Sequence, residues 1–200
     1  MDFQDLVKNR YSCRRYLDKP IPEDTIYRLL EITRHSASAI NMQPWKIKVV
    51  SDRDTKERLF PATFGQNQVR TCSHLLVLCA DTDYPEIIAR LDRALGAAGV
   101  DDDMRARTIG LATEVSQRMT PEQLLQWSQS QVHIALGNAL NGAYSLGLGA
   151  CPMTAFRPDE FARILDLPAN LVPTVLVSLG FPAEEQPTRK LRYPLEDILV

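Results

Sequence analysis

Six consecutive apolar residues, Leu75-Leu76-Val77-Leu78-Cys79-Ala80, form the longest hydrophobic run in the sequence. The run is much shorter than the roughly 18 residues of a membrane-spanning helix, and its length is typical of a β-strand. Because successive side chains of a strand point to opposite faces of its sheet, a strand that is apolar throughout must be covered on both faces. We therefore expect residues 75–80 to form a central strand, buried between other elements.

Strand and helix patterns alternate along the rest of the chain. Residues 45–49 alternate apolar with cationic side chains, which is typical of a half-buried strand, and residues 174–179 form a second apolar strand pattern. Apolar spacing and proline or glycine boundaries predict helices over residues 2–9, 22 to about 36, 55–59, 84–98, 103–118, 120–146 and 158–165. Since no internal repeat or linker separates these segments, we expect residues 1–200 to form a single α+β domain.

The charge balance excludes a broad surface for polyanions. The 23 Lys and Arg residues nearly balance 25 Asp and Glu residues, so the chain lacks the basic excess that nucleic-acid binding needs, and any anion site is local. The stretch Met1 to Asp5 lacks the basic and apolar regions of a signal peptide, so we expect a cytoplasmic protein without membrane contact. The four cysteines and three histidines lack metal-binding spacing, and we expect no metal site.

Cationic residues near the two ends of the chain are candidates for a binding site. Arg10, Ser12 and Arg14 stand at alternate positions, so in an extended segment their side chains point to one side. Lys190 and Arg192 repeat this spacing near the C-terminus. Two guanidinium forks, an ammonium group and a hydroxyl together suit a phosphomonoester. The alternative is that these residues are ordinary solvated surface charge.

The sequence offers no catalytic nucleophile. Neither Cys13 nor Cys151 lies in the signature of a cysteine hydrolase, and the chain contains no GxGxxG fingerprint and no P-loop. A nucleotide would therefore need another binding device, and the cationic residues near the chain ends supply one.

Four blocks of the sequence resemble signatures of the FMN-dependent nitroreductase family. The first is Arg10-Tyr11-Ser12-Cys13-Arg14-Arg15-Tyr16, similar to the family motif R-x-S-x-R. The second is Ser38-Ala39-Ile40-Asn41-Met42-Gln43-Pro44-Trp45, similar to S-x-x-N-x-Q-P-W. The third is Gly147-Leu148-Gly149-Ala150-Cys151-Pro152-Met153, and the closing one is Arg189-Lys190-Leu191-Arg192-Tyr193-Pro194 followed by Leu195-Glu196-Asp197. Together they span nearly the whole chain in the family's order.

The resemblance implies a three-layer α+β fold in which helices flank a central, mostly antiparallel sheet, assembled as an intertwined homodimer. It further implies that FMN binds at the subunit interface. NADH or NADPH would be the reductant, and a nitroaromatic, a quinone or a similar small molecule would accept the electrons.

By position, the resemblance also assigns roles to individual residues. Those implied to hold the FMN phosphate and ribityl chain are Arg10, Ser12, Lys190 and Arg192. Those implied to come from the partner subunit are Ser38, Ala39 and Asn41, and those implied to lie along the isoalloxazine are Pro152, Met153 and Thr154. Arg14 at the pyrimidine edge and a backbone N–H near Thr154, directed at flavin N5, would tune the flavin, so that no catalytic side chain is required.

The chain departs from the family pattern around residue 65. Gly65 stands where relatives often carry an asparagine that contacts the flavin, and the position of Gln68 is Lys in some relatives and Gln in others. We expect Gln66 and Gln68 to replace these contacts by uncharged hydrogen bonds, the alternative being an ordinary polar loop. Thr154 replaces an acidic residue of some enteric relatives. Tyr11, between the phosphate candidates, is also expected to bind the cofactor.

The resulting hypothesis is an FMN oxidoreductase that works in alternating turns. NAD(P)H delivers hydride to flavin N5 and leaves, and the acceptor then enters the same cleft. Because a fold does not determine a reaction, three alternatives remain. They are another flavin reaction on the same scaffold (reductive dehalogenation, ene reduction or flavin breakdown), a flavin- or phosphate-binding module without turnover, and a structural helical dimer.

Overall fold

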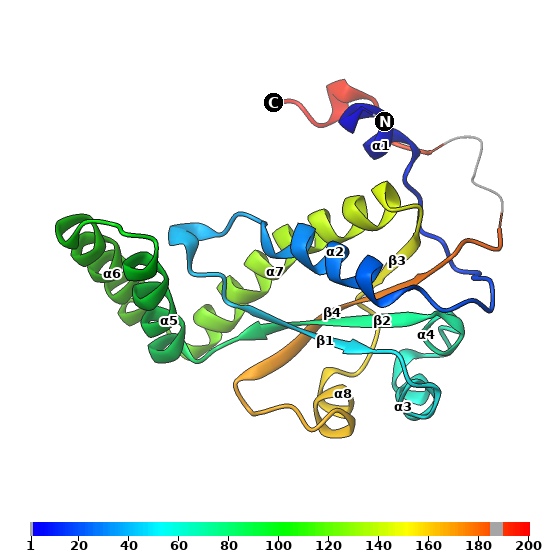
Figure 1. The fold of residues 1–200 in the computed structure, drawn as a ribbon, viewed down its shortest axis with the longest axis horizontal. Helices are drawn as coiled ribbons and strands as arrows, with labels where there is room; N and C mark the ends of the chain where they lie inside the picture. The colour runs from blue at the N-terminus through cyan, green and yellow to red at the C-terminus, as the bar shows by residue number, and fades with distance from the viewer. Residues whose placement is uncertain (1, 185–189) are drawn as a thin grey trace.

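The structure is a computed structural model that describes residues 2–184 and 190–200 (Figure 1). Its helices are α1 (Phe3–Asn9), α2 (Glu23–Arg34), α3 (Arg53–Leu59), α4 (Gln68–Thr71), α5 (Tyr84–Ala97), α6 (Asp102–Gln117), α7 (Pro121–Ser145) and α8 (Pro158–Ile164). Its strands are β1 (Trp45–Val50), β2 (His74–Asp81), β3 (Gly149–Met153) and β4 (Leu171–Gly180). All the helices that the sequence predicts are present, each within one turn of its predicted bounds.

Among the described residues, the strands form one antiparallel sheet in the order β1-β2-β4-β3. β2 pairs along one edge with β1, from Trp45↔Ala80 to Val50↔Leu75, and along the other edge with β4. Every side chain from Leu75 to Ala80 is buried. The prediction of a central strand covered on both faces is therefore confirmed.

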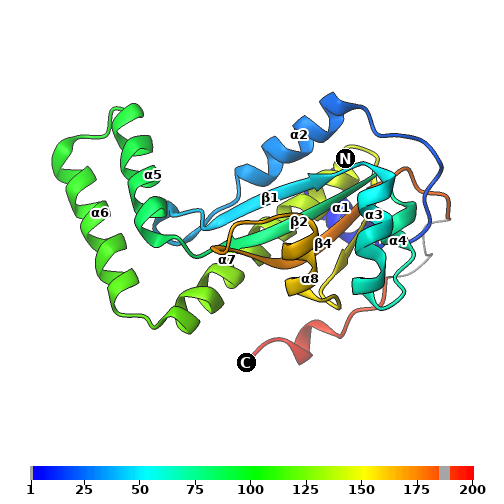
Figure 2. The same cartoon turned by 90° about the horizontal axis from the view of Figure 1, so that it is seen from below.

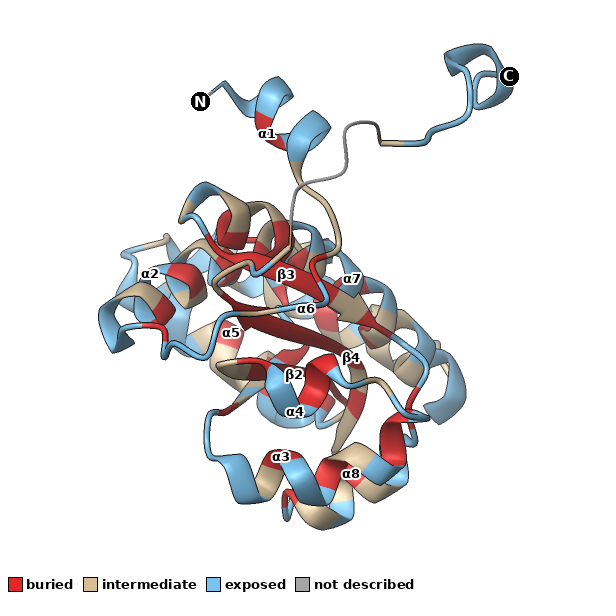
Figure 3. Ribbon diagram, turned by 90° about the vertical axis from the view of Figure 1, so that its right-hand side faces the viewer, coloured by how far each residue is buried: buried red, intermediate tan, exposed pale blue. Residues whose placement is uncertain are grey.

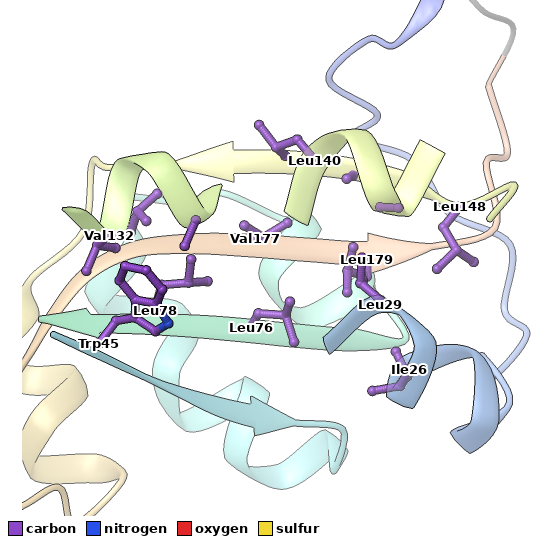
Figure 4. Close-up of a cluster of buried hydrophobic side chains, with 14 of the residues drawn as sticks. Ile26, Leu29, Trp45, Leu76, Leu78, Val132, Leu140, Leu148, Val177 and Leu179 are labelled. Atoms are coloured by element: carbon purple, nitrogen blue, oxygen red, sulfur yellow. The ribbon is translucent and has the colours of Figure 1, made fainter. Parts of the chain in front are cut away.

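Helices α2 and α7 cover one face of this sheet (Figure 4). The even-numbered residues Leu76 and Leu78 of β2 point to this side and join Val177 of β4 in a buried cluster. Leu29 of α2 and Val132 of α7 close the cluster from above, each fully shielded from solvent. Alternate side chains of a strand point to the same face of the sheet, and here they pack against the apolar faces of two helices.

Helices α3, α4 and α8 lie on the opposite face. The odd-numbered residues Leu75 and Val77 of β2 pack there with Leu59 of α3, Val69 of α4 and Phe161 of α8. Figure 3 shows the buried residues concentrated on the strands and on the helix surfaces turned toward them. Two helical layers with an antiparallel sheet between them confirm the expected three-layer α+β fold.

Helices α5 and α6 form a hairpin that projects beyond the end of the sheet (Figures 1 and 2). The hairpin has a small core of its own, in which Ile87 and Leu91 of α5 meet Ala112, the one buried residue of α6. It is fastened to α7, because the hydroxyl of Tyr84 contacts Ser128 at 2.8 Å. None of the helices within residues 2–184 and 190–200 combines the length and the apolar character that crossing a bilayer requires.

Among the α-helices and strands of the described residues, α4 and β3 were not predicted from the sequence. The segment of β3 reads Gly-Ala-Cys-Pro-Met and lacks the β-branched and aromatic residues that mark most strands. Its Pro152 is compatible with a strand because β3 lies at an edge of the described sheet, where a residue need not donate to a second neighbour. The strand therefore depends on its pairing with β4 and not on local preference.

Close packing between α2 and α7 gives a stability prediction. A Cβ on Gly142 of α7 would lie 2.9 Å from Ile32 Cγ2 and 3.1 Å from Leu29 Cδ1, whereas a Cβ on Gly110 of α6 would meet nothing within 4 Å. We expect Gly142→Ala to lower the free energy of unfolding by about 1–3 kcal/mol through overpacking. Gly110→Ala should be neutral or should stabilise by up to about 1 kcal/mol through helix propensity.

Urea unfolding of both variants, followed by far-UV circular dichroism, measures this difference. Equal stabilities of the two variants would show that α2 moves away from α7 without cost.

Candidate functional site

The segment after α1 runs in extended form beside the edge strand β3. Ser12 forms a parallel bridge with Ala150, and the Cys13 amide donates to the Ala150 carbonyl at 3.1 Å. Cys13 is fully buried, while Ser12 is half-buried and Arg14 is exposed. The approach requires a glycine at position 149, since a Cβ there would lie 2.7 Å from the Cys13 sulfur.

Three cationic side chains from opposite ends of the chain gather at the start of this segment: Arg10, Lys190 and Arg192. The Lys190 ammonium donates to the Val7 carbonyl at 2.7 Å, which fixes the C-terminal part beside α1. Burial and then the charges of Arg10 and Arg192 hold the pKa of Lys190 below its ordinary value. Burial and then Arg192 lower the pKa of Arg10 in the same way. Arg189, from the same sequence block, lies outside the described residues.

No carboxylate forms an ion pair with Arg10, Lys190 or Arg192 within the described residues. A cavity of about 220 Å³ opens beside Arg10, and Tyr11 and Leu140 are among its other lining residues. The Tyr11 hydroxyl donates to the Glu184 carbonyl at 3.3 Å, and its pKa is raised to about 12, chiefly by burial. Arg10 and Lys190 are half-buried and Arg192 is exposed, so the cluster is a partly buried positive site without a paired carboxylate among the described residues.

Arg14 lies beside β3, further from the start of that strand than Arg10. Its backbone amide donates to Glu184 Oε1 at 2.7 Å, so the carboxylate is held by the main chain. Burial raises the pKa of Cys151, and the charge of Arg14 opposes this rise. The exposed guanidinium of Arg14 is thus near the middle of β3, whereas Arg10 is near its start.

The loop before α4 is tied to the other end of β3. Gln68 is buried, and its Nε2 contacts Met153 Sδ and Gln66 Oε1, each at 3.3 Å. Gln66 Nε2 donates to the Ala155 carbonyl at 2.7 Å. Thr154, next to the buried Met153, is exposed. One edge of the sheet therefore gathers most of the residues that the resemblance assigns to the cofactor: Arg10, Tyr11, Ser12, Arg14, Gln66, Gln68, Pro152, Met153 and Thr154. Lys190 and Arg192 lie near Arg10, where Lys190 is bound to α1.

Ser38, Ala39 and Asn41 lie elsewhere, in a turn whose 3₁₀ helix η1 spans Ala39–Asn41. In Figure 1 this turn follows α2 toward α5, while the segment after α1 descends on the opposite side of the molecule. The Ala39 amide donates to Gln131 Oε1 of α7 at 2.9 Å, whereas Leu140 of α7 lines the cavity beside Arg10. A helix rises about 1.5 Å per residue, so these points on α7 are roughly 14 Å apart. Within one chain, the turn that contains Ser38, Ala39 and Asn41 is therefore separate from the residues around Arg10 and β3.

The turn containing η1 has a strained backbone. Ile40, Asn41 and Gln43 all adopt the left-handed region, with φ of 55°, 56° and 47°. This region is disfavoured for a β-branched residue such as Ile40, and such strain persists only where the surroundings hold it in place. The Ser38 hydroxyl accepts from the Gln43 amide at 2.9 Å and closes the turn.

Two amide side chains of α7 hold this turn, and sequence reasoning missed both. Gln131 is buried and accepts from Ala39, and Asn138 Nδ2 donates to the hydroxyl of Ser36 at 2.9 Å. Residues seven apart lie on the same face of a helix. In the sequence, two amide residues seven apart beside the apolar positions of α7 were the signal that could have identified these contacts. Phe156, three residues after Met153, is buried against Phe161 with ring centroids 4.9 Å apart.

Known proteins resemble this chain over nearly its whole length. The family model described as the nitroreductase family matches residues 7–181. A Thermus thermophilus protein named NADH dehydrogenase is 36% identical over 201 residues, which cover 100% of this chain and 96% of the relative. A Staphylococcus haemolyticus protein, provisionally named as an NAD(P)H nitroreductase, is 30% identical over 217 residues, with 98% and 97% covered.

A solved structure has the same fold. It is a provisionally assigned nitroreductase of Exiguobacterium sibiricum in complex with FMN, and it aligns with a TM-score of 0.90 at 24% identity, covering 100% of this chain and 97% of that one. The family match and the level of identity to the relatives show that the chain belongs to the nitroreductase family, whose members are oxidoreductases. The family resemblance read from the four sequence blocks is thereby confirmed.

The contact between Gln131 and Ala39 gives a prediction about the strained turn. Gln131→Met keeps the length of the side chain but removes the acceptor, whereas Gln131→Glu keeps an oxygen in the same place. Losing one hydrogen bond costs about 1 kcal/mol, so amide exchange in residues 38–43 should speed up about fivefold in the methionine variant. The glutamate variant should change less.

Hydrogen–deuterium exchange with peptide-level mass spectrometry measures this effect. If amide exchange of residues 38–43 in the methionine variant is as slow as in the wild type, Gln131 does not hold the turn.

Proposed function

We propose that residues 1–200 form a single FMN-binding domain that works as an NAD(P)H-dependent oxidoreductase on nitroaromatics, quinones or similar small acceptors. The observation that carries this proposal is the cluster of Arg10, Lys190 and Arg192, which no carboxylate neutralises within the described residues. Family membership supports the class of reaction.

The cationic cluster fits the phosphate end of FMN. Burial, and then the nearby charge of Arg192, lower the pKa values of Arg10 and Lys190, so the charged forms of both residues carry a free-energy cost. A phosphate dianion would remove this cost, because it places negative charge among them and accepts several charge-assisted hydrogen bonds. Ser12, half-buried between Arg10 and Arg14, would add a hydroxyl donor.

The edge of β3 fits the ring system. Met153 and Thr154 would lie along the isoalloxazine, and Gln66 and Gln68, already linked to this end of β3, would reach its polar edge. The exposed guanidinium of Arg14 would stabilise negative charge at the pyrimidine edge. When bound, FMN supplies the redox chemistry, taking hydride from NAD(P)H and passing two electrons to the acceptor.

The thiols of this chain are poor nucleophiles, which agrees with chemistry carried by a cofactor. Cys13, the cysteine inside the cationic segment, is fully buried, and burial is the main reason that its pKa is raised to about 11. The thiol therefore stays protonated at neutral pH.

In the reduction of a nitro group to a nitroso group, the acceptor takes two electrons and two protons and releases water, and NADH with one solvent proton supplies them.

A second copy of the chain would complete the site. Ser38, Ala39 and Asn41 lie away from the β3 edge of their own chain, so the partner's copy of this turn would meet the cofactor there. The C-terminal part of the chain presents large apolar side chains to solvent, namely Leu191, Tyr193, Leu195, Ile198 and Leu199. Such an exposed apolar set is typical of an interaction surface. We propose a homodimer with FMN at the interface.

Absorbance of the freshly purified protein tests this function. A flavin spectrum that bleaches on anaerobic addition of NADH or NADPH, and returns when a nitroaromatic or quinone is added, is the expected result. Double-reciprocal plots should give parallel lines, because reductant and acceptor share one cleft. A flavin that neither nucleotide reduces would favour a binding module without turnover, and a colourless protein that takes up no FMN would contradict the proposal.

Removing one phosphate contact should release the cofactor. We expect Arg10→Ala to weaken FMN binding about 10- to 100-fold, which corresponds to losing a charge-assisted contact of roughly 1.5–3 kcal/mol. Lys48→Ala, which removes an exposed cation on β1, should leave it unchanged. Titration of the apoprotein with FMN, followed by quenching of flavin fluorescence, measures both constants. Equal losses in the two variants would refute the assignment of the phosphate site.

A further inference from the structure

Phe64 combines a disfavoured backbone with an exposed aromatic ring. Its φ is 52° and that of Gly65 is 80°, so two consecutive residues are left-handed. The left-handed region is uncommon for a bulky residue and persists where the surroundings impose it. The side chain is nevertheless 64% exposed, so burial of the ring does not compensate for the backbone. The left-handed pair ends the 3₁₀ helix η2 (Phe60–Thr63), and the turn presents the ring of Phe64 to solvent.

Arg157 stacks on this ring. Its guanidinium carbon lies 5.5 Å from the centroid of Phe64, within the range of a cation–π contact. The backbone of Arg157 is fixed, since its amide donates to the Ala62 carbonyl at 2.9 Å. The side chain is exposed and forms no ion pair among the residues that the structure describes. Its donors are therefore available to an anion.

The Phe64–Arg157 pair lies next to the proposed flavin contacts. Gln66 and Gln68, which follow Phe64, bind residues that precede Arg157: Gln66 donates to the Ala155 carbonyl, and Gln68 contacts Met153. The loop that carries Phe64 and the segment that carries Arg157 are thus cross-linked at three points, including the contact between Arg157 and Ala62. A ligand reaching the ring system proposed above would meet an aromatic face and a guanidinium in a fixed arrangement.

We propose that Phe64 and Arg157 form an acceptor subsite that selects planar aromatic acceptors carrying a carboxylate. The ring of Phe64 offers a stacking surface to the aromatic acceptor. The planar guanidinium of Arg157 matches a carboxylate with two parallel hydrogen bonds. This inference rests on the proposed function and adds the class of acceptor to it.

A pair of acceptors that differ in charge tests the subsite. 4-Nitrobenzoate and 4-nitrobenzamide have similar size, and only the first carries a carboxylate. We expect Arg157→Gln to lower the ratio of kcat/KM for nitrobenzoate to that for nitrobenzamide about tenfold. Arg28→Gln, which removes an exposed arginine on α2 on the other face of the sheet, should leave the ratio as in the wild type.

The role of the ring is tested separately. Phe64→Leu should lower kcat/KM for both acceptors several-fold, because the stacking surface is lost for each, and the ratio between them should stay unchanged. FMN content and melting temperature of each variant establish that cofactor and fold are retained. Raising the salt concentration should reduce the wild-type preference for nitrobenzoate, since the contact is exposed to screening.

Each other outcome overturns the inference. With parallel-line kinetics, kcat/KM for NADH and for the acceptor are independent, so an Arg157→Gln effect on NADH alone would assign the guanidinium to the reductant. An unchanged ratio in an active variant would refute the subsite while leaving the proposed function intact. A wild-type protein that binds FMN but transfers no electrons to either compound would refute both.

Discussion

Burial of β2 on both faces is the interaction from which the rest of the architecture follows. A strand with no polar face can be stable only with one neighbour on each edge and a helical layer above and below. β1 and β4 supply the edges, and α2 with α7 on one side and α3, α4 and α8 on the other supply the layers. This leaves β3 at the margin of the described sheet, where Ser12 and its neighbours can pair with it.

The electrostatics of the candidate site oppose its own assembly. Arg10 near the N-terminus is brought together with Lys190 and Arg192 near the C-terminus, although the charge of Arg192 disfavours the charged forms of both Arg10 and Lys190. Chain ends are usually the least ordered parts of a domain, and here they converge on a surface that a dianion would stabilise. In the chain alone, the hydrogen bond between Lys190 and the Val7 carbonyl links the two ends.

Features with a local signal could be predicted from the sequence, and features created by tertiary contact could not. The apolar run from Leu75 to Ala80 and the boundary at Pro121 were sufficient for β2 and α7. β3 was missed because its stability comes from pairing with β4. The convergence of Arg10 with Lys190 was expected from the family resemblance, since spacing alone left a solvated surface as an alternative. Gln131 was missed because its partner, the Ala39 amide, is 92 residues away in sequence.

The long helix α7 sets the distance between two parts of the chain. Its first half binds the turn at Ala39 through Gln131, and its second half lines the cavity beside Arg10. Inserting one residue between these points would rotate everything beyond it by about 100° and would break one of the two attachments. The hairpin of α5 and α6 is attached differently: Met42, together with Leu124 and Trp127 of α7, packs against its small core. Over evolution, the length of α7 should hold constant while that hairpin grows, shrinks and changes composition freely.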